Sequence, residues 1–151
     1  MEQIVQLNSQ ANLSEHFKLG EFTRSNSHPE VYNIPTHEAI ANLKRVCEWL
    51  EVLRSRVGEP ILINSGYRSP QLNKKIGGVP TSNHLTGCAV DIRVADMGQL
   101  IRYAAILMDY ADESHQDFDE ILIEKNRYGA IWLHFAVRAK GNRRKVNFIQ
   151  A

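Results

Sequence analysis

Two histidines and an aspartate in this chain have types and spacing that could bind a metal ion: His84, Asp91 and His134. His84 and Asp91 are seven residues apart, with Gly87 between them. Imidazole nitrogens and carboxylate oxygens are both zinc ligands, and catalytic zinc sites typically combine three protein ligands with a fourth position left to water. The three residues therefore predict a catalytic rather than a structural zinc site.

Asp91 lies in the alternating run AVDIRV, residues 89–94, which predicts a strand. Because successive side chains alternate, Ala89, Asp91 and Arg93 share one face. A carboxylate on an otherwise β-branched strand needs a partner, and a cation is an economical one. Spacing alone leaves a second interpretation open, in which Asp91 forms a local cap or salt bridge and His134 is a hydrogen-bonded histidine of a sheet.

Cys88 provides a further alternative because it adjoins the candidate ligands. A thiolate binds zinc, and a fourth protein ligand would close the coordination sphere and make the site structural. Alternation places Cys88 with Val90, opposite Asp91, which favours a packed thiol. The other cysteine, Cys47, falls in a helical pattern and is expected to be a small core residue. One possible pair in 151 residues does not indicate a disulfide framework.

The elements expected to position these residues are helices interspersed with short strands. Apolar residues recur at three- and four-residue steps in two segments, each of which predicts a long helix. The first begins near Thr36 and ends at Gly58, and Asp96 caps the second. The remaining expected elements are a helical turn after Asn12, a buried strand at 61–63 followed by a turn at 64–66, a short helix from 69 to 76, and a hairpin with arms 121–124 and 131–137.

Composition and charge exclude several classes of protein. The chain is 43% hydrophobic and 23% charged, which is typical of a soluble globular protein, and its net charge of +1 gives no support to nucleic-acid binding. No stretch reaches the length of a membrane span, and the first six residues lack a signal-peptide pattern. The basic residues between 138 and 145 are expected to form a solvated tail, with a binding patch as the alternative. We expect one domain over residues 1–151, monomeric and synthesised in the cytoplasm.

Four runs of sequence resemble one known family. SGYRSPQLNKKIGG, TSNHLTGCAVD, FDEILIE and WLHF are similar to the zinc D-alanyl-D-alanine metallopeptidases, a group that includes peptidoglycan carboxypeptidases, phage endolysins and vancomycin-resistance D,D-dipeptidases. The resemblance covers most of the chain. It implies the hedgehog/DD-peptidase fold, which is α+β with a small antiparallel sheet and flanking helices.

The resemblance also implies a site. Its members would be His84, Asp91 and His134 as zinc ligands, with Arg68, Ser82 and Tyr67 towards the substrate. The guanidinium of Arg68 can stabilise a carboxylate or a developing oxyanion, and Ser82 can offer its hydroxyl to the peptide. Tyr67 and Trp132 could form groove walls, although aromatic residues are ordinarily found in cores. Bound zinc would polarise the scissile carbonyl and lower the pKa of water to roughly 7.

The chemistry also requires a general base, and here the chain departs from part of the family. In the dipeptidases and some endolysins an acidic residue stands three positions before the last zinc histidine, where this chain has Ile131. We expect Glu124 to be the base, with Asp119 and Glu120 as the next candidates. The alternative for Glu124 is a salt-bridging residue at the end of a hairpin arm.

These observations predict a zinc metallopeptidase that hydrolyses peptidoglycan stem-peptide bonds, of the D-Ala-D-Ala carboxypeptidase or the endopeptidase type. The alternative is a zinc-bearing peptidoglycan- or protein-binding module that keeps the fold without the chemistry, and Ile131 is the residue in its favour. A cell-wall enzyme without a signal peptide would fit a phage or prophage lysin.

Overall fold

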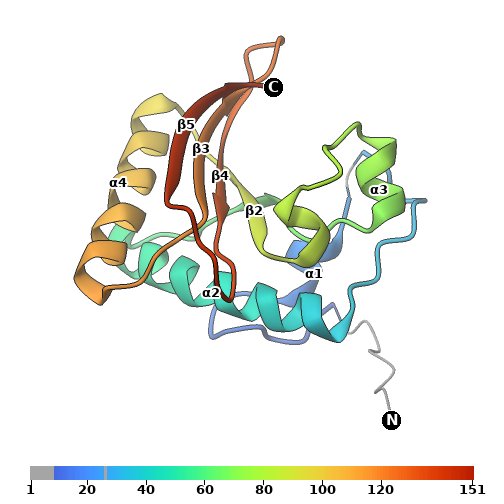
Figure 1. Cartoon of the computed structure of the whole chain (residues 1–151), viewed down its shortest axis with the longest axis horizontal. Coiled ribbons are helices and arrows are strands. Elements are labelled where there is room, and N and C mark those ends of the chain that lie inside the picture. Colours follow the sequence, from blue (N-terminus) through green and yellow to red (C-terminus); the bar gives the residue numbers. More distant parts are fainter. Residues whose placement is uncertain (1–8, 26) are drawn as a thin grey trace.

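A computed structural model describes residues 9–25 and 27–151 of the chain (Figure 1). Its five strands are β1 Ile63–Ser65, β2 Ala89–Arg93, β3 Glu120–Lys125, β4 Ile131–Ala136 and β5 Lys145–Gln150. Its helices are α1 Leu19–Thr23, α2 His37–Val57, α3 Pro70–Lys75 and α4 Met97–Ser114, with one 3-10 turn, η1, at Asn83–Thr86. The expected α+β class is confirmed.

The helices begin and end where side chains and glycines meet the needs of their terminal backbone groups. The Thr36 hydroxyl accepts a hydrogen bond from the first turn of α2, and Gly58 ends that helix with φ of 72°. Ser69 caps α3, where Pro70 occupies the first helical position, and the Asp96 carboxylate caps α4. All of these boundaries were expected from the sequence.

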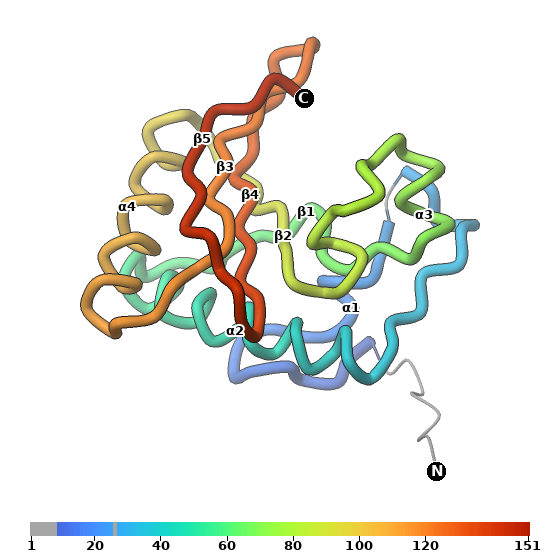
Figure 2. The backbone as a smooth tube through the Cα atoms, in the orientation of Figure 1, coloured from blue at the N-terminus to red at the C-terminus, as the bar shows by residue number. Residues whose placement is uncertain are grey.

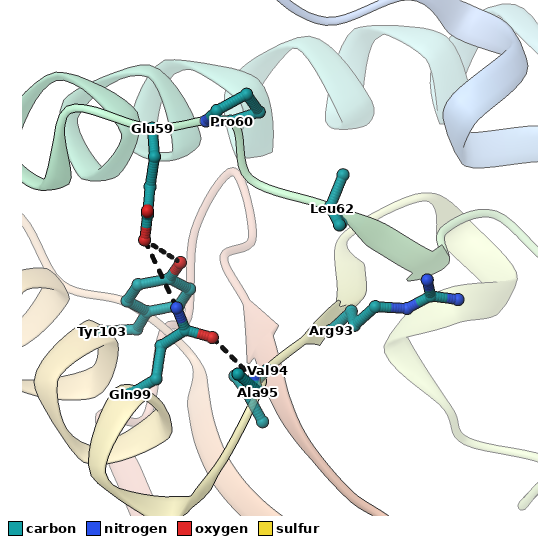
Figure 3. Close-up of a pocket in the computed structure, with 8 residues that line it drawn as sticks. All are labelled: Glu59, Pro60, Leu62, Arg93, Val94, Ala95, Gln99 and Tyr103. Carbon is teal, nitrogen blue, oxygen red and sulfur yellow. Dashed lines mark hydrogen bonds between the residues drawn. The ribbon is translucent and has the colours of Figure 1, made fainter.

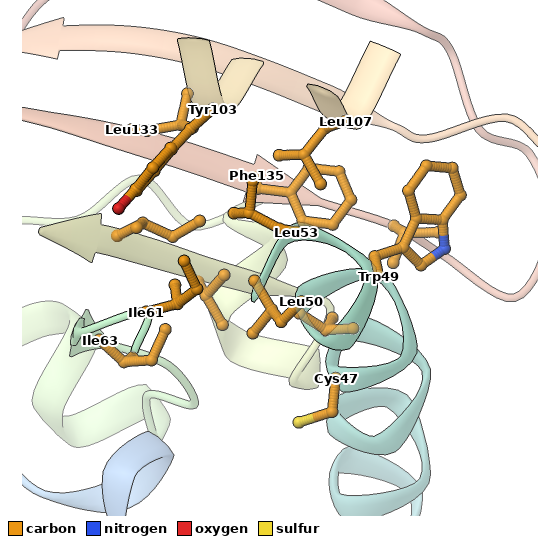
Figure 4. Close-up of a cluster of buried hydrophobic side chains, with 14 of the residues drawn as sticks. Cys47, Trp49, Leu50, Leu53, Ile61, Ile63, Tyr103, Leu107, Leu133 and Phe135 are labelled. Atoms are coloured by element: carbon orange, nitrogen blue, oxygen red, sulfur yellow. The ribbon is translucent and has the colours of Figure 1, made fainter. Parts of the chain in front are cut away.

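The hydrophobic core lies between one face of the sheet and the two long helices (Figure 4). Helix α2 contributes Trp49, Leu50 and Leu53, helix α4 contributes Tyr103 and Leu107, and β4 contributes Leu133 and Phe135. Full burial of one such side chain is worth about 1.5–3 kcal/mol. The core therefore fixes the sheet from one side, and the residues that alternate with these on β2, β3 and β4 point to the other side.

The sheet runs in the order β1-β2-β4-β3-β5, and the first four strands are antiparallel. In this register Asp91 on β2 lies directly opposite His134 on β4, and His134 lies opposite Leu122 on β3. Figure 1 places α4 on one side of these strands and α3 on the other. The face that carries Asp91 and His134 is therefore turned towards the segment that contains α3 and η1.

The C-terminal segment differs from expectation. No strand was expected after the hairpin, but residues 145–150 form β5, which pairs with β3 in parallel and lies beside it along its length (Figure 2). The sheet is therefore mixed rather than wholly antiparallel. Side chains of β5 are mostly exposed, including Phe148 at 70%, and this edge position explains why its hydrophobic pattern is weak.

Two shorter elements also differ. The helical turn expected after Asn12 is absent; Asn12 instead forms a β-bridge with Lys18, and α1 follows it. The strand expected at 61–63 is β1, shifted to include part of the expected turn, and Leu62 is 53% exposed rather than buried. Among the described residues, no helix combines the length and the hydropathy that crossing a bilayer requires.

We predict that Gly87→Ala destabilises the fold more than Gly58→Ala. Both glycines have positive φ, 76° for Gly87 and 72° for Gly58, so alanine at either position should lower the free energy of unfolding by about 1–2 kcal/mol. A Cβ at Gly87 would also lie 2.4 Å from the carbonyl oxygen of Ala39, whereas one at Gly58 would meet nothing within 4 Å. The measurement is urea unfolding of both variants. Equal losses would show that the approach of η1 to α2 is not tight.

Candidate metal centre

Three separate elements bring His84, Asp91 and His134 together. His84 is on η1, Asp91 on β2 and His134 on β4, and one ligand atom from each lies within 4.8 Å of the other two. All three side chains are buried. Directly opposed residues of antiparallel strands have Cβ atoms about 4.5–5.5 Å apart, so the β2–β4 register accounts for two of the three.

The η1 turn positions the first histidine. The Ser82 hydroxyl accepts a hydrogen bond from the His84 backbone N–H, and Gly87 ends the turn with φ of 76°. The carbonyl of His84 accepts from the Arg68 N–H at 3.0 Å. The motif from Ser82 to Asp91 therefore encodes a turn that points one imidazole at the strand following it.

The hydrogen bonds of His84 determine which of its nitrogens faces Asp91. Its Nδ1 lies 2.6 Å from the carbonyl oxygen of Gly66, which can only accept, so Nδ1 carries a proton. Burial lowers the pKa of His84, which favours the neutral ring. Its Nε2 is then a lone pair directed at Asp91 Oδ1, 3.2 Å away.

In His134 the two ring nitrogens have exchanged places relative to His84, so that Nδ1 rather than Nε2 faces Asp91. Its Nε2 lies 3.0 Å from Glu120 Oε1, and its Nδ1 lies 3.2 Å from Asp91 Oδ1. Burial alone would lower the pKa of His134, but hydrogen bonds to Asp91 and Glu120 raise it to about 9. The neutral ring would direct a third lone pair at the same point. A cation must lie among these three atoms, and either a proton on His134 or a metal ion can fill that role.

This donor set fits zinc. Two imidazole nitrogens and a carboxylate leave one coordination position open, as in catalytic zinc sites. In each histidine the ring nitrogen that faces away from Asp91 is hydrogen-bonded to an oxygen. This hydrogen bond fixes the tautomer in which the other nitrogen presents a lone pair to a metal. Cys88 is buried and does not belong to this group of ligand atoms among the described residues.

A pocket of about 640 Å³ opens beside the three residues. Arg68, Ser82 and Glu124 line it together with His84 and His134. The Glu124 carboxylate accepts a hydrogen bond from the Trp132 indole, its direct neighbour across the β3–β4 pair. Burial, and after it the negative charge of Asp91, raise the pKa of Glu124 above its ordinary value.

Arg68 lies between this pocket and a second hollow of about 330 Å³. Its guanidinium donates to Asp91 Oδ2 at 3.3 Å and to the side chains of Asn73 and Ser65 at 3.2 Å and 3.3 Å. Each of its two terminal nitrogens carries two N–H groups, and one hydrogen bond is formed by each nitrogen within the described residues. Arg68 therefore both holds Asp91 and borders the space on either side of it.

One expected site residue, Tyr67, lies away from the pocket. Tyr67 is buried in the core at 6% exposure, with its backbone N–H bonded to Phe22, and does not line the pocket. Ile131 is half-buried opposite Lys125, at the end of the hairpin arm. Of the other expected residues, His84, His134, Arg68, Ser82, Glu124 and Glu120 line the pocket and Asp91 lines its neighbour, whereas Asp119 and Trp132 line neither.

Asn83, Arg138 and Arg143 were not expected in the site, yet all three line its pocket and form a polar network there. Asp119 is fully buried and accepts from Arg143 Nη2 and Asn83 Nδ2, both at 2.8 Å. Arg138 donates to Asn83 Oδ1 at 2.9 Å. Two of the basic residues expected to be solvated, Arg138 and Arg143, therefore neutralise a buried carboxylate. Only the FDE run hinted at this, since a buried carboxylate needs a cation.

Another pocket, of about 370 Å³, lies away from this centre, near the end of α2 and the start of α4 (Figure 3). Glu59 there accepts from Gln99 and Tyr103 at 3.3 Å and 3.4 Å. The Glu59 carboxylate is therefore hydrogen-bonded within the protein. None of His84, Asp91 and His134 lines this pocket. The chemistry is therefore concentrated at the first pocket.

The fold and this centre define a metallopeptidase-like protein, and comparison with known proteins gives the family. The family model for peptidase M15 matches residues 15–120, more than two thirds of the chain. The chain belongs to the peptidase M15 family, which confirms the resemblance to zinc D-alanyl-D-alanine metallopeptidases. The chain is also 31% identical over 84 residues to a zinc D-Ala-D-Ala carboxypeptidase of Streptomyces albus G. That match covers 55% of this chain and 33% of the relative, so most of the relative lies outside it.

We predict that Asp119→Asn destabilises the protein in a pH-dependent way. Burial raises the pKa of Asp119, but hydrogen bonds from Arg143 and Asn83 outweigh it and hold the pKa at about 2, below its ordinary 3.8. A lowered carboxyl pKa stabilises the fold above pH 4, and that stabilisation is lost as the pH falls towards 2. The variant should be about 2 kcal/mol less stable at pH 7, and the difference should shrink below pH 4.

The measurement is urea unfolding between pH 7 and pH 2.5. Asp109→Asn, the same chemical change at an exposed position of α4, is the matched control and should alter stability little. A difference between Asp119→Asn and wild type that stays constant over this range would contradict the ion pair.

Proposed function

We propose that this protein is a zinc-dependent peptidase that hydrolyses a bond in peptidoglycan stem peptides, of the D-Ala-D-Ala carboxypeptidase or the endopeptidase type. The observation that carries the proposal is the convergence of His84 Nε2, Asp91 Oδ1 and His134 Nδ1 beside a pocket. Membership of the peptidase M15 family supports the reaction class, and the Streptomyces relative supports the substrate.

Zinc held by His84, Asp91 and His134 would supply a Lewis acid that polarises a peptide carbonyl and makes water nucleophilic near neutral pH. Glu124 is the proposed general base, since it borders the same pocket and its raised pKa brings it closer to the working pH. Its carboxylate would take the proton from the attacking water and pass it to the leaving amine. The Trp132 indole would hold that carboxylate in place.

Arg68 is proposed to bind the substrate. Arg68 borders both hollows, where its guanidinium could meet a carboxylate or the developing oxyanion. A peptide bound across Arg68 would have room on both sides of the scissile bond, which suits a substrate longer than a dipeptide. Ser82 could donate its hydroxyl proton to the peptide while its oxygen accepts from His84. Tyr67 would act only through packing.

We predict that the purified protein contains one zinc ion per chain and that Glu124→Gln lowers kcat on a peptide ending in D-Ala-D-Ala by about 10²–10⁴-fold. The zinc content of this variant should equal that of wild type, because Glu124 is not a proposed ligand. His84→Ala should lose both zinc and activity. Metal analysis and chromatography of the cleaved peptide measure these quantities.

Glu113→Gln is the matched control, since Glu113 is an exposed carboxylate on α4 whose ion pair with Arg56 contributes little. It should cleave like wild type. A wild-type protein that binds zinc but cleaves neither the peptide nor isolated muropeptides would favour the zinc-bearing binding module instead. A wild type without zinc would refute both functions.

A further inference from the structure

Two glutamates of β3 border the pocket, and their neighbours across the strand pair give them different surroundings. Glu120 lies opposite Ala136 and Glu124 lies opposite Trp132. The side chain of Ala136 is too small to fill the space before it, so Glu120 can reach diagonally across it to His134. Trp132 occupies the corresponding space beside Glu124 and takes its hydrogen bond. Diagonal neighbours in a sheet are within reach of long side chains.

The contact of Glu120 with His134 is direct. Glu120 Oε1 lies 3.0 Å from His134 Nε2, on the side of the imidazole away from Asp91. The Glu120 side chain is 13% exposed and that of His134 is 8% exposed, so water competes little for this bond. A carboxylate bonded to the far nitrogen of a ligand histidine fixes the orientation and tautomer of the ring and increases its basicity.

Other residues fix the Glu120 carboxylate in turn. Asn83 Nδ2 donates to the same Oε1 at 2.7 Å and to Asp119 Oδ2 at 2.8 Å. Arg143 lies 3.5 Å from Glu120 Oε2 and forms an ion pair with Asp119. Asn83 precedes His84 in the chain, so one amide connects the turn that carries the first proposed ligand to the carboxylate behind the third.

We propose that Glu120 is a positioning residue for the metal centre, which acts through His134 and is itself held by Asn83. The inference rests on the proposed function, because it takes His134 Nδ1 as a zinc ligand. It assigns different roles to two carboxylates of one strand: Glu120 determines how tightly the metal is held, and Glu124 moves the proton. Glu120 is then not the base, although its place in the sequence had made it a candidate.

The experiment compares Glu120→Ala, Glu120→Gln and Glu124→Gln for zinc affinity, measured by competition with a chromophoric chelator. Glu120→Ala should weaken zinc binding by about 10–100-fold, the usual effect of removing such a partner. Glu120→Gln keeps the size and an accepting oxygen and should weaken binding less. Glu124→Gln, the matched control in the same pocket, should bind zinc like wild type. The visible spectrum of the cobalt-substituted protein should change with Glu120→Ala and not with Glu124→Gln.

A second measurement needs no metal. In the metal-free protein the Nε2 proton of His134 should give a downfield NMR resonance protected from exchange, which Glu120→Ala removes and Glu124→Gln retains. If wild type binds no zinc, the proposed function fails, whereas this resonance still tests the contact. Wild-type zinc affinity in Glu120→Ala would overturn the inference, as would a Glu120→Gln variant with full zinc affinity and no turnover, since Glu120 would then be the base.

Discussion

The structure depends on the convergence of three electron-pair donors on one point. Asp91 Oδ1 lies 3.2 Å from a nitrogen of His84 and 3.2 Å from a nitrogen of His134, and all three side chains are buried. Such an arrangement is unfavourable unless a positive charge lies among the donors. The β2–β4 register, the η1 turn and the bonds to the far nitrogens all maintain it. These donors therefore need a positive charge among them, which a proton on His134 or a metal ion would supply.

The two faces of the sheet have different roles. One face packs against α2 and α4 and supplies the hydrophobic stabilisation. The other carries the polar residues, which alternate with the core residues along the same strands. Each strand that holds a proposed ligand is thus anchored by its own neighbours: Ile92 beside Asp91, and Leu133 and Phe135 beside His134. Rigid strands hold such constellations more accurately than loops do.

Much of this could be predicted from the sequence because local patterns determine it. Helix caps such as Thr36 and Ser69, the alternation around Asp91 and the hairpin arms all depend on neighbouring residues. The specific motif from Ser82 to Asp91 identified the family. What could not be predicted depends on distant contacts. Strand β5 has a weak pattern because it lies at an edge, and the Asn83 amide shows no sign in the sequence of the carboxylates it joins.

The spacing of the three proposed ligands also has a consequence for the order of synthesis. The third follows the second by more than forty residues, a stretch that contains α4, β3 and the hairpin turn. A chain emerging from the ribosome therefore has only two of the three proposed ligands in place until β4 has paired with β2. Two ligands bind zinc far less tightly than three. Under the proposed function, the protein would gain its metal, and with it the proposed peptidase activity, only when the sheet is nearly complete.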